Sequence, residues 1–268
     1  MVLRFFLLAA IFLLDSCTDF ERNNPDDTGS INYVSDQLSS SAEGGALPSS
    51  SSESSSSSVV PVVPSSSSVR AQHMLIPGVP VTYGNETYQT VVIGSQTWMA
   101  RNLNYDVPDN DTDVCYNCAG YGRLYNWATA MGIDARYNKE KWDYDNTKID
   151  EKHKGICPNE WHIPSDADWN ALINAVGGAG TAGKNLKATS GWQYESGYDT
   201  FGFSALPGGT GDSDGYLYYA GSNGYWWSAS EKSAYNASYW AMGSTEKEKV
   251  YWEYNGKDNL FSIRCVKD

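Results

Sequence analysis

Aromatic side chains are distributed very unevenly along this chain of 268 residues. All ten tryptophans lie after residue 97, whereas the only aromatic residues among the first 79 are Phe5, Phe6, Phe12, Phe20 and Tyr33. A hydrophobic core requires large apolar side chains that pack together. We therefore expect residues 80–268 to form the folded part of the chain.

Serine dominates the segment that precedes this part. The middle of residues 17–79 reads SSSAEGGALPSSSSESSSSSVVPVVPSSSSV. Serine tracts bury too little apolar surface to offset the entropy of the chain, and the VVPVVP piece is stiff and extended. We expect residues 17–79 to be a disordered linker.

Residues 1–16 have the pattern of an export signal. Arg4 supplies a positive charge, and the apolar run from Phe5 to Leu14 is too short to span a bilayer. The segment LDSC, which ends at Cys17, resembles the lipobox of bacterial lipoproteins, although Asp15 departs from the small neutral residue usual there. We expect an acylated Cys17 that anchors the exported chain at the outer membrane or cell surface. The alternative is a plain secretory signal with an incidental cysteine.

The other four cysteines, once Cys17 is set aside, form an even set. They are Cys115, Cys118, Cys157 and Cys265. An exported chain meets an oxidising compartment, so we expect two disulfides, for which three connectivities are open. We favour Cys115 with Cys118 and Cys157 with Cys265. One CxxC with two distant cysteines does not make a closed zinc site, and we expect no cofactor.

Hydrophobic spacing predicts short strands and two helices in the folded part. Short strands are expected in VTYGNETYQTVVIGSQTWMARNLNY, with a turn at Gly94 and Ser95. The first helix is expected from Leu124 to Met131, ended by Gly132. The second follows Ser165, which forms a capping box with Asp168.

The last third of the chain is aromatic and punctuated by glycine. A hairpin is predicted with its tip at residues 245–249, between residues 239–242 on one arm and 250–254 on the other. Helices in the first half and irregular sheets in the second predict one α+β domain.

The chain is acidic, with a formal net charge of -13 and a pI near 4.6. Binding to nucleic acid requires a positive patch that releases counterions, and the sequence shows no basic cluster. We therefore expect no nucleic-acid partner. The charge fits a neutral or cationic partner, such as a neutral glycan.

Seven blocks, in order, resemble the Fibrobacter succinogenes major paralogous domain. They are TVVIGSQTWMARNLNY, CYNCAGYGRLYNWATAM, GICPNEWHIPSDADWNAL, LKATSGW, FGFSALPGG, YWWSASE and FSIRCVKD. That family is similar to the C-type lectin-like superfold, which implies two helices, small antiparallel sheets and a long irregular loop region. The superfold also implies a disulfide between the second-helix neighbourhood and the last strand, where Cys157 and Cys265 stand.

Adjacent tryptophans in YWWSASE raise the question of which rings are exposed. Neighbouring side chains of a strand point to opposite faces, so Trp226 and Trp227 cannot both enter the same core. We expect one to be packed inside and the other to face a ligand surface, because aromatic rings bind the apolar faces of sugars. The ligand-binding candidates are Tyr218, Tyr219, Tyr225, Trp227 and Trp240.

The sequence contains little that indicates a metal-binding site. The Glu-Pro-Asn and Gln-Pro-Asp triplets of calcium-dependent lectins are absent, and the nearest calcium candidates are Asp212 and Asp214 in GTGDSDGY, with a structural calcium elsewhere left open. Two carboxylates do not make a complete site, so we expect no metal.

Motifs of hydrolases and nucleotide-binding enzymes are absent as well. No GxSxG elbow, HExxH or phosphate-binding loop occurs, and His162 lies in an apolar setting typical of a buried histidine. We therefore expect a protein that is not an enzyme, with a formylglycine-generating or glycan-active enzyme as the less favoured reading.

Together these features predict a lipid-anchored surface protein. Its folded domain is expected to bind an extracellular polysaccharide or other glycan. The alternative is a non-catalytic module of the cell envelope that binds a protein partner or has a structural role.

Overall fold

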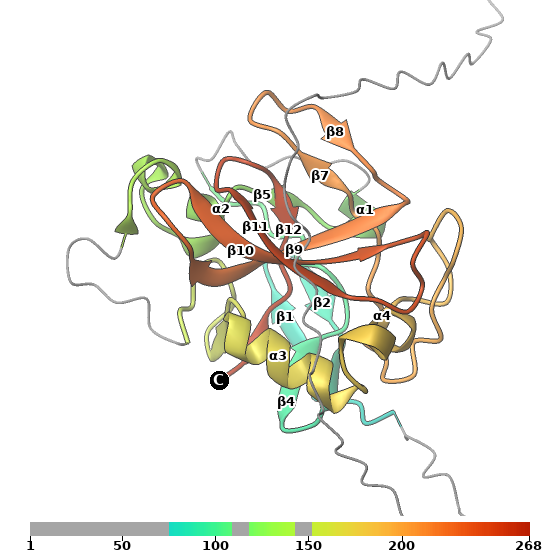
Figure 1. Ribbon diagram of the computed structural model, residues 1–268. Helices are drawn as coiled ribbons and strands as arrows, with labels where there is room; N and C mark the ends of the chain where they lie inside the picture. Colours follow the sequence, from blue (N-terminus) through green and yellow to red (C-terminus); the bar gives the residue numbers. More distant parts are fainter. Residues whose placement is uncertain (1–74, 109–117, 143–151) are drawn as a thin grey trace, which may run out of the picture. The chain divides into compact units, whose positions relative to one another are not determined.

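The computed structural model describes residues 75–108, 118–142 and 152–268 (Figure 1). The chain divides into two units, Met1–Asn32 and Tyr33–Asp268. All of the described residues belong to the second unit. The predicted signal, almost all of the predicted linker, Cys17, Cys115 and the side chain of Cys118 lie outside the described residues. None of the helices within the described ranges is both long and apolar enough to cross a membrane.

One sheet joins the two ends of the folded part in the order β3-β4-β13-β6. Its strands are β3 (Thr90–Ile93), β4 (Gln96–Met99), β6 (Trp161–His162) and β13 (Val266–Lys267). The hairpin between β3 and β4 turns at Gly94, which adopts φ +60°, as the turn signal predicted. A separate two-stranded sheet is made of β1 (Val81–Tyr83) and β2 (Glu86–Tyr88).

A second, five-stranded sheet has the order β11-β10-β9-β12-β5. Its strands are β5 (Leu124–Tyr125), β9 (Asn223–Glu231), β10 (Asn236–Gly243), β11 (Tyr251–Gly256) and β12 (Phe261–Ser262). Strands β10 and β11 pair in antiparallel register, with Trp240 opposite Trp252. This pairing confirms the hairpin predicted around residues 245–249. A further small hairpin consists of β7 (Thr210–Gly211) and β8 (Leu217–Tyr218).

The helix after Ser165 is α3 (Asp166–Ala175), and it begins as predicted. The Ser165 side chain accepts from the backbone N–H of Asp168, and the Asp168 carboxylate accepts from that of Ser165. These reciprocal bonds satisfy two backbone N–H groups that the first turn leaves without intrahelical partners.

The other predicted helix is shorter than its spacing suggested. Helix α2 (Trp127–Met131) begins at Trp127, after an Asn126 cap, and ends at Gly132 in a left-handed conformation. Leu124 lies in β5, because its backbone pairs with Ser262 of β12. Three further segments were not predicted: α1 (Cys118–Tyr121), the 3-10 helix η1 (Ala135–Asn138) and α4 (Ala179–Leu186). Helices and antiparallel sheets together make an α+β fold, as expected.

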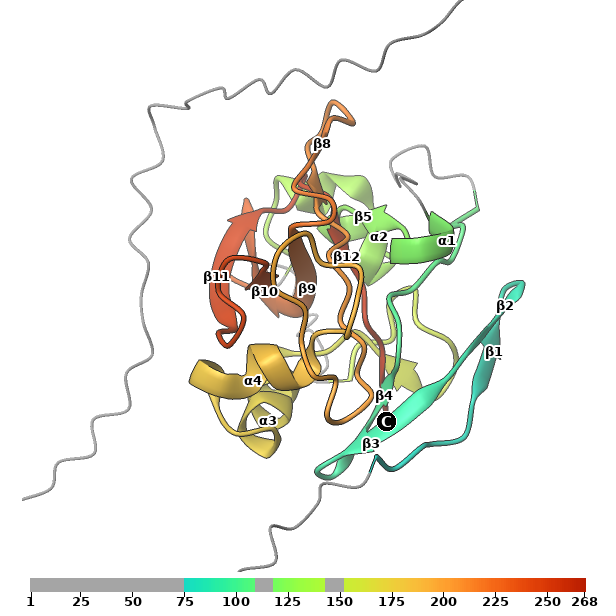
Figure 2. The ribbon, with the colours of Figure 1, turned by 90° about the vertical axis from the view of Figure 1, so that its right-hand side faces the viewer.

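Both faces of β9 are covered, and this resolves the question of the paired tryptophans. Helices α3 and α2 lie on opposite sides of the strand (Figures 1 and 2). Trp226 packs on the α3 side with Trp169, at 6.3 Å between ring centroids, and Trp227 packs on the α2 side with Phe261, at 4.3 Å. Both tryptophan side chains are fully buried, so each enters a core of its own.

A disulfide joins the segment before β6 to the end of the chain. It links Cys157 and Cys265, which are 108 residues apart in sequence and are both buried. The bond therefore fastens the third quarter of the chain to β13, in the place that the resemblance implied.

Candidate functional site

The β7–β8 hairpin presents a group of tyrosines on a turn that one carboxylate organises. Asp212 Oδ1 accepts hydrogen bonds from the backbone N–H groups of Asp214, at 3.0 Å, and of Tyr216, at 2.9 Å. Asp212 Oδ2 accepts from the Tyr218 hydroxyl at 3.1 Å. The carboxylate thus ties the turn to the strand that leaves it, and it fixes where the hydroxyl end of the Tyr218 side chain lies.

Three tyrosines of this hairpin and its base are open to solvent. The exposed fractions are 66% for Tyr216, 47% for Tyr218 and 60% for Tyr219. The rings of Tyr218 and Tyr219 are 6.4 Å apart and tilted by 45°. Figures 1 and 2 both show the hairpin extending beyond the five-stranded sheet. We call these three residues the tyrosine hairpin.

Tyr219 has a backbone conformation that is unusual for its residue type. Its φ is +60°, in the left-handed region, which costs a residue with a Cβ atom about 1 kcal/mol or more. Its carbonyl oxygen accepts from the backbone N–H groups of Ser222 and Asn223 and from the Ser222 hydroxyl, at 2.9 to 3.0 Å. These bonds offset the strain and hold the Tyr219 backbone in one conformation.

The base of the hairpin requires glycine at one point. A Cβ atom added to Gly209 would lie 2.4 Å from the carbonyl oxygen of Tyr218, and Gly209 itself has φ +72°. Strand β8 therefore approaches the backbone of the preceding loop more closely than another residue would allow.

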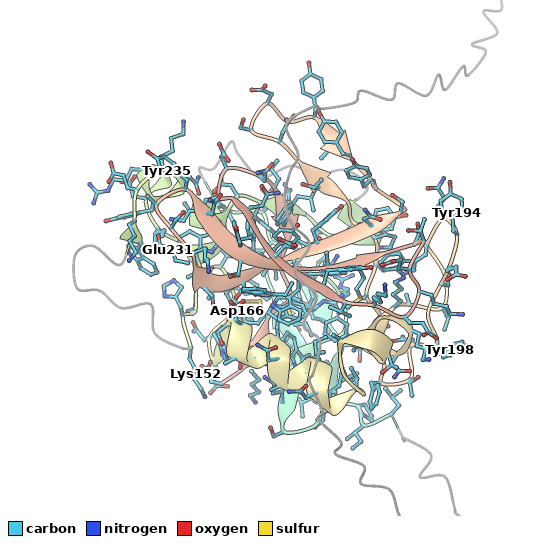
Figure 3. All side chains as sticks on the ribbon, viewed as in Figure 1. Lys152, Asp166, Tyr194, Tyr198, Glu231 and Tyr235 are labelled. Carbon is cyan, nitrogen blue, oxygen red and sulfur yellow. A yellow bond between two sulfur atoms is a disulfide. The ribbon has the colours of Figure 1, made fainter. Side chains whose placement is uncertain are left out.

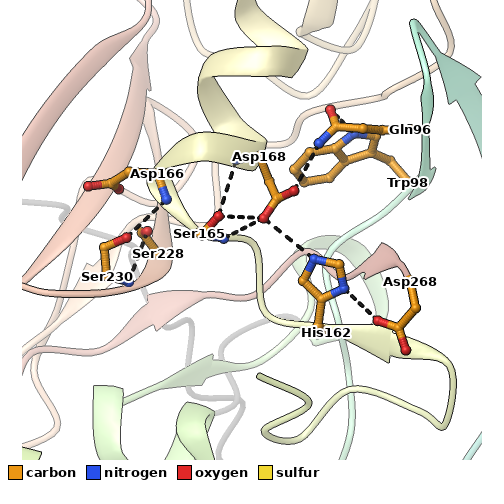
Figure 4. Close-up of polar contacts among 9 residues, drawn as sticks. All are labelled: Gln96, Trp98, His162, Ser165, Asp166, Asp168, Ser228, Ser230 and Asp268. Atoms are coloured by element: carbon orange, nitrogen blue, oxygen red, sulfur yellow. Dashed lines mark hydrogen bonds and ion pairs between the residues drawn. The ribbon is translucent and has the colours of Figure 1, made fainter. Parts of the chain in front are cut away.

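A second polar cluster surrounds His162 at the start of α3 (Figure 4). Its Nδ1 contacts Asp268 Oδ1 at 2.7 Å, and its Nε2 forms an ion pair with Asp168 Oδ2 at 3.4 Å. Burial alone would lower the pKa of His162, but the hydrogen bonds and charges of the two carboxylates raise it. Ser165 Oγ donates to Asp168 at 2.6 Å rather than to the imidazole, so the cluster lacks the serine–histidine bond of a nucleophilic site. It fastens α3 to the C-terminal strand.

Comparison with known proteins now decides the family. The model of the Fibrobacter succinogenes major domain matches residues 91–267. The chain belongs to this family. No curated protein and no solved structure matches the chain.

Three sequence blocks of the Fibrobacter succinogenes major domain meet inside the fold at Asn102. Its Oδ1 accepts from Trp226 Nε1 and from Arg264 Nη2, both at 2.8 Å. Arg264 is fully buried and also donates to the carbonyl oxygens of Met99 and Phe203. Burial lowers the pKa of Arg264 to about 9. The blocks ARNLNY, YWWSASE and FSIRCVKD thus build a polar core rather than an exposed site.

Two of the five aromatic candidates in the Fibrobacter succinogenes major domain were assigned wrongly. Trp227 is 0% exposed and Trp240 is 4% exposed, so neither ring can meet a ligand at the surface. Trp240 instead stacks on Trp169, with ring centroids 6.0 Å apart. The prediction failed because it assumed one solvent-facing side of the sheet, whereas helices and loops cover both sides.

The other three candidates lie near one another. Tyr218 and Tyr219 belong to the tyrosine hairpin, whereas Tyr225 is half-buried and stacks on Phe261 at 5.3 Å. Burial raises the pKa of Tyr225, and its hydroxyl accepts from Asn223 Nδ2 at 2.8 Å. Tyr225 therefore supports the base of the hairpin.

Tyr216 completes the group and was missed from the sequence. The signal was present in DGYLYY, where Tyr216 and Tyr218 are two residues apart and Leu217 lies between them. Side chains two apart in a strand share a face, so the partner of Tyr218 could have been named.

Of the two calcium candidates, the Asp212 carboxylate serves the hairpin itself, and Asp214 donates its backbone N–H to that carboxylate. Both oxygens of Asp212 accept hydrogen bonds from its own turn. Across the described ranges, no group of three or more His, Cys, Asp and Glu side chains could hold a metal ion.

Proposed function

We propose that this chain is a lipid-anchored surface protein whose folded domain binds an extracellular polysaccharide through the tyrosine hairpin. The observation that carries the proposal is the exposure of Tyr216, Tyr218 and Tyr219 on a turn fixed by Asp212. Exposed aromatic rings on a fixed turn are a feature of binding surfaces, since large apolar groups at the surface need another reason to be there.

The chemistry of the rings favours a sugar. A tyrosine ring offers an apolar face and a polar tip, which matches the apolar faces and hydroxyl groups of a sugar ring. A turn that is ordered before binding loses little conformational entropy when the ligand arrives. The bonds to Asp212 and to the Tyr219 carbonyl oxygen supply that order.

We further infer that the domain has a C-type lectin-like fold. Three features support this inference. The strands near the two ends of the domain are neighbours in one sheet, residues 187–222 form a long loop region with little regular structure, and Cys157 is bonded to Cys265. Folds of this kind serve many functions, so the fold alone does not assign the ligand.

Export and anchoring belong to the same proposal. The lipobox-like segment at Cys17 and the serine-rich linker would place the domain outside the cytosol, at the outer membrane or cell surface. Two or more acyl chains on Cys17 would give stable anchoring, which one chain does not.

The test is retention of the purified full chain, in mild detergent, on insoluble cellulose, chitin, xylan and mannan. We expect at least one of them to retain the chain and Tyr218→Ala to weaken that binding roughly tenfold, by about 1.4 kcal/mol. Tyr235→Ala is the matched control, because Tyr235 is also a largely exposed tyrosine but lies elsewhere in the fold (Figure 3). A chelator should change nothing.

Absence of retention on every polysaccharide would overturn glycan binding. The envelope module with a protein partner would then be the better account, with the same hairpin as its contact surface. Retention that a chelator abolishes would instead reveal a metal-dependent site and contradict a platform made of tyrosine rings alone.

A further inference from the structure

A fourth exposed tyrosine, Tyr194, lies on a loop that is hydrogen-bonded to the base of the tyrosine hairpin. Tyr194 is 68% exposed, and Figure 3 shows its side chain directed away from the sheet. The residues on either side of it are both bound to neighbouring loops. Gln193 N–H donates to the carbonyl oxygen of Gly221 at 2.7 Å, and Glu195 N–H donates to that of Ser244 at 3.2 Å.

The same bonds connect this loop to the tyrosine hairpin. Gly221 is two residues after Tyr219, and Ser244 N–H donates to the carbonyl oxygen of Ser222 at 2.7 Å. With 3.8 Å between consecutive Cα atoms, the Cα atoms of Tyr194 and Tyr219 lie within about 17 Å of each other. Tyr194 therefore lies close to the tyrosine hairpin while remaining a separate contact point.

Contacts with buried residues hold the loop that carries Tyr194. Trp192, two residues earlier, is buried, and its Nε1 donates to the carbonyl oxygen of Ala205 at 3.0 Å. The buried ammonium of Lys187 lies 4.6 Å from the centre of the Trp192 ring and donates to the carbonyl oxygens of Gly243 and Glu246. Like the hairpin, this loop is held by the core.

Charge limits what this extended surface can bind. Residues 188–222 contribute four acidic side chains and no Lys, Arg or His, and a cation beside this loop, Lys247, lies over the ring of Tyr198. The acidic residues are Glu195, Asp199, Asp212 and Asp214. A ligand with its own carboxylates or sulfates would be repelled, whereas an uncharged chain of sugars would not.

Tyr198 is not part of this surface, although it is also largely exposed. The ammonium of Lys247 lies over its ring at 4.5 Å from the centroid. One face of this ring is already occupied by a cation. Tyr198 is thus a natural control for Tyr194, on the same loop and of the same residue type.

We propose that Tyr194 and the tyrosine hairpin together bind a stretch of several sugar units within an uncharged polysaccharide, rather than a single sugar or a charged glycan. This inference rests on the proposed function and specifies its ligand. Two fixed aromatic contact points, separated by a loop junction, favour a ligand long enough to touch both, because the second contact is then made within one complex.

The experiment measures how gluco-, xylo-, chito- and manno-oligosaccharides of one to six units compete with the polysaccharide that retains the full chain. We expect monosaccharides not to compete and the hexasaccharide to compete at least roughly tenfold better than the disaccharide. Tyr194→Ala should abolish this gain with length and leave disaccharide competition unchanged. Tyr198→Ala should behave as the wild type, and polygalacturonate should not compete.

The outcomes separate this inference from the proposed function. Retention on a polysaccharide with equal competition by monosaccharide and hexasaccharide would overturn the inference and leave glycan binding in place. The inference would also be overturned if Tyr194→Ala, shown to be folded by its unfolding curve, kept the length dependence of the wild type. Competition by polygalacturonate as strong as that by a neutral chain would overturn it too, and both results would leave glycan binding in place. Absence of retention on every polysaccharide would overturn both.

Discussion

His162 is the clearest case in which a single side chain controls stability. It is buried between two carboxylates from different elements, Asp168 in α3 and Asp268 after β13. The pKa of His162 is raised above 6.5 by these carboxylates. Burial would raise the pKa of Asp168, but its bonds to His162 and Ser165 lower it below 3.8.

These opposite shifts define a pH window. The contribution of His162 to stability is complete below about pH 6.5 and is lost as the pH rises through its higher folded pKa. The contribution of Asp168 is present above about pH 4 and is lost as the pH falls through its lower folded pKa. The pair therefore stabilises the fold most between these limits.

The corresponding variant is His162→Asn. We expect the free energy of unfolding to fall by about 1 to 3 kcal/mol at pH 5 to 6, because partly buried carboxylates lose a charged partner. The deficit should shrink as the pH rises above neutrality. Urea denaturation at several pH values from 5 to 9 measures it, with Asp268→Asn expected to show a smaller effect of the same sign. A deficit that is independent of pH would refute the ion-pair account.

At this scale, sequence reasoning reached only part of the site. Tyr218 and Tyr219, two of the aromatic candidates, are exposed, as a ligand-binding surface requires. The burial of Trp227 depends on what covers the second face of β9, which strand periodicity cannot reveal. Arg264 was also missed, since a buried guanidinium needs carbonyl partners from residues 60 to 165 positions away.

At the scale of elements, the sequence predicted correctly those features whose interacting residues are close together in the chain. The capping box of α3 involves residues three apart, and the hairpin of β10 and β11 joins neighbouring segments. Helix α4 was missed because AGTAGKNL contains two glycines and its C-terminal Leu186 provides the only large apolar side chain. Leu124 was assigned to a helix, although pairing with a strand more than a hundred residues later places it in β5.

The disulfide between Cys157 and Cys265 gives a prediction at the element scale. The bond closes a loop of 108 residues. Its loss should raise the conformational entropy of the unfolded chain and so stabilise the unfolded state relative to the folded one. We expect Cys157→Ser to lower the free energy of unfolding by about 2 to 5 kcal/mol. Urea denaturation of the variant, compared with wild type in the presence and absence of a reductant, measures this.

The reductant provides the control for that experiment. Reduced wild type and Cys157→Ser should unfold at similar urea concentrations, and the variant should not respond further at this bond. A variant as stable as the oxidised wild type would show that the bond does not form in the mature protein.

The whole molecule, as we propose it, is a folded domain on a serine-rich linker with a lipid at Cys17. Cys17→Ser should then release the protein from the membrane fraction without changing the denaturation curve of the domain, because the anchor and the domain are separated by the linker. Fractionation of cells followed by immunoblotting measures the release. Full retention of Cys17→Ser in the membrane fraction would contradict the lipid anchor.

The central claim is that the tyrosine hairpin makes the domain a polysaccharide-binding protein. Its most direct test is the binding isotherm of the full chain on the insoluble neutral polysaccharide that retains it best, compared with the combined variant Tyr216→Ala, Tyr218→Ala and Tyr219→Ala. The account predicts saturable binding by the wild type and a loss of at least roughly a hundredfold in affinity for the variant, with an unchanged denaturation curve. A folded variant that binds as tightly as the wild type would contradict it.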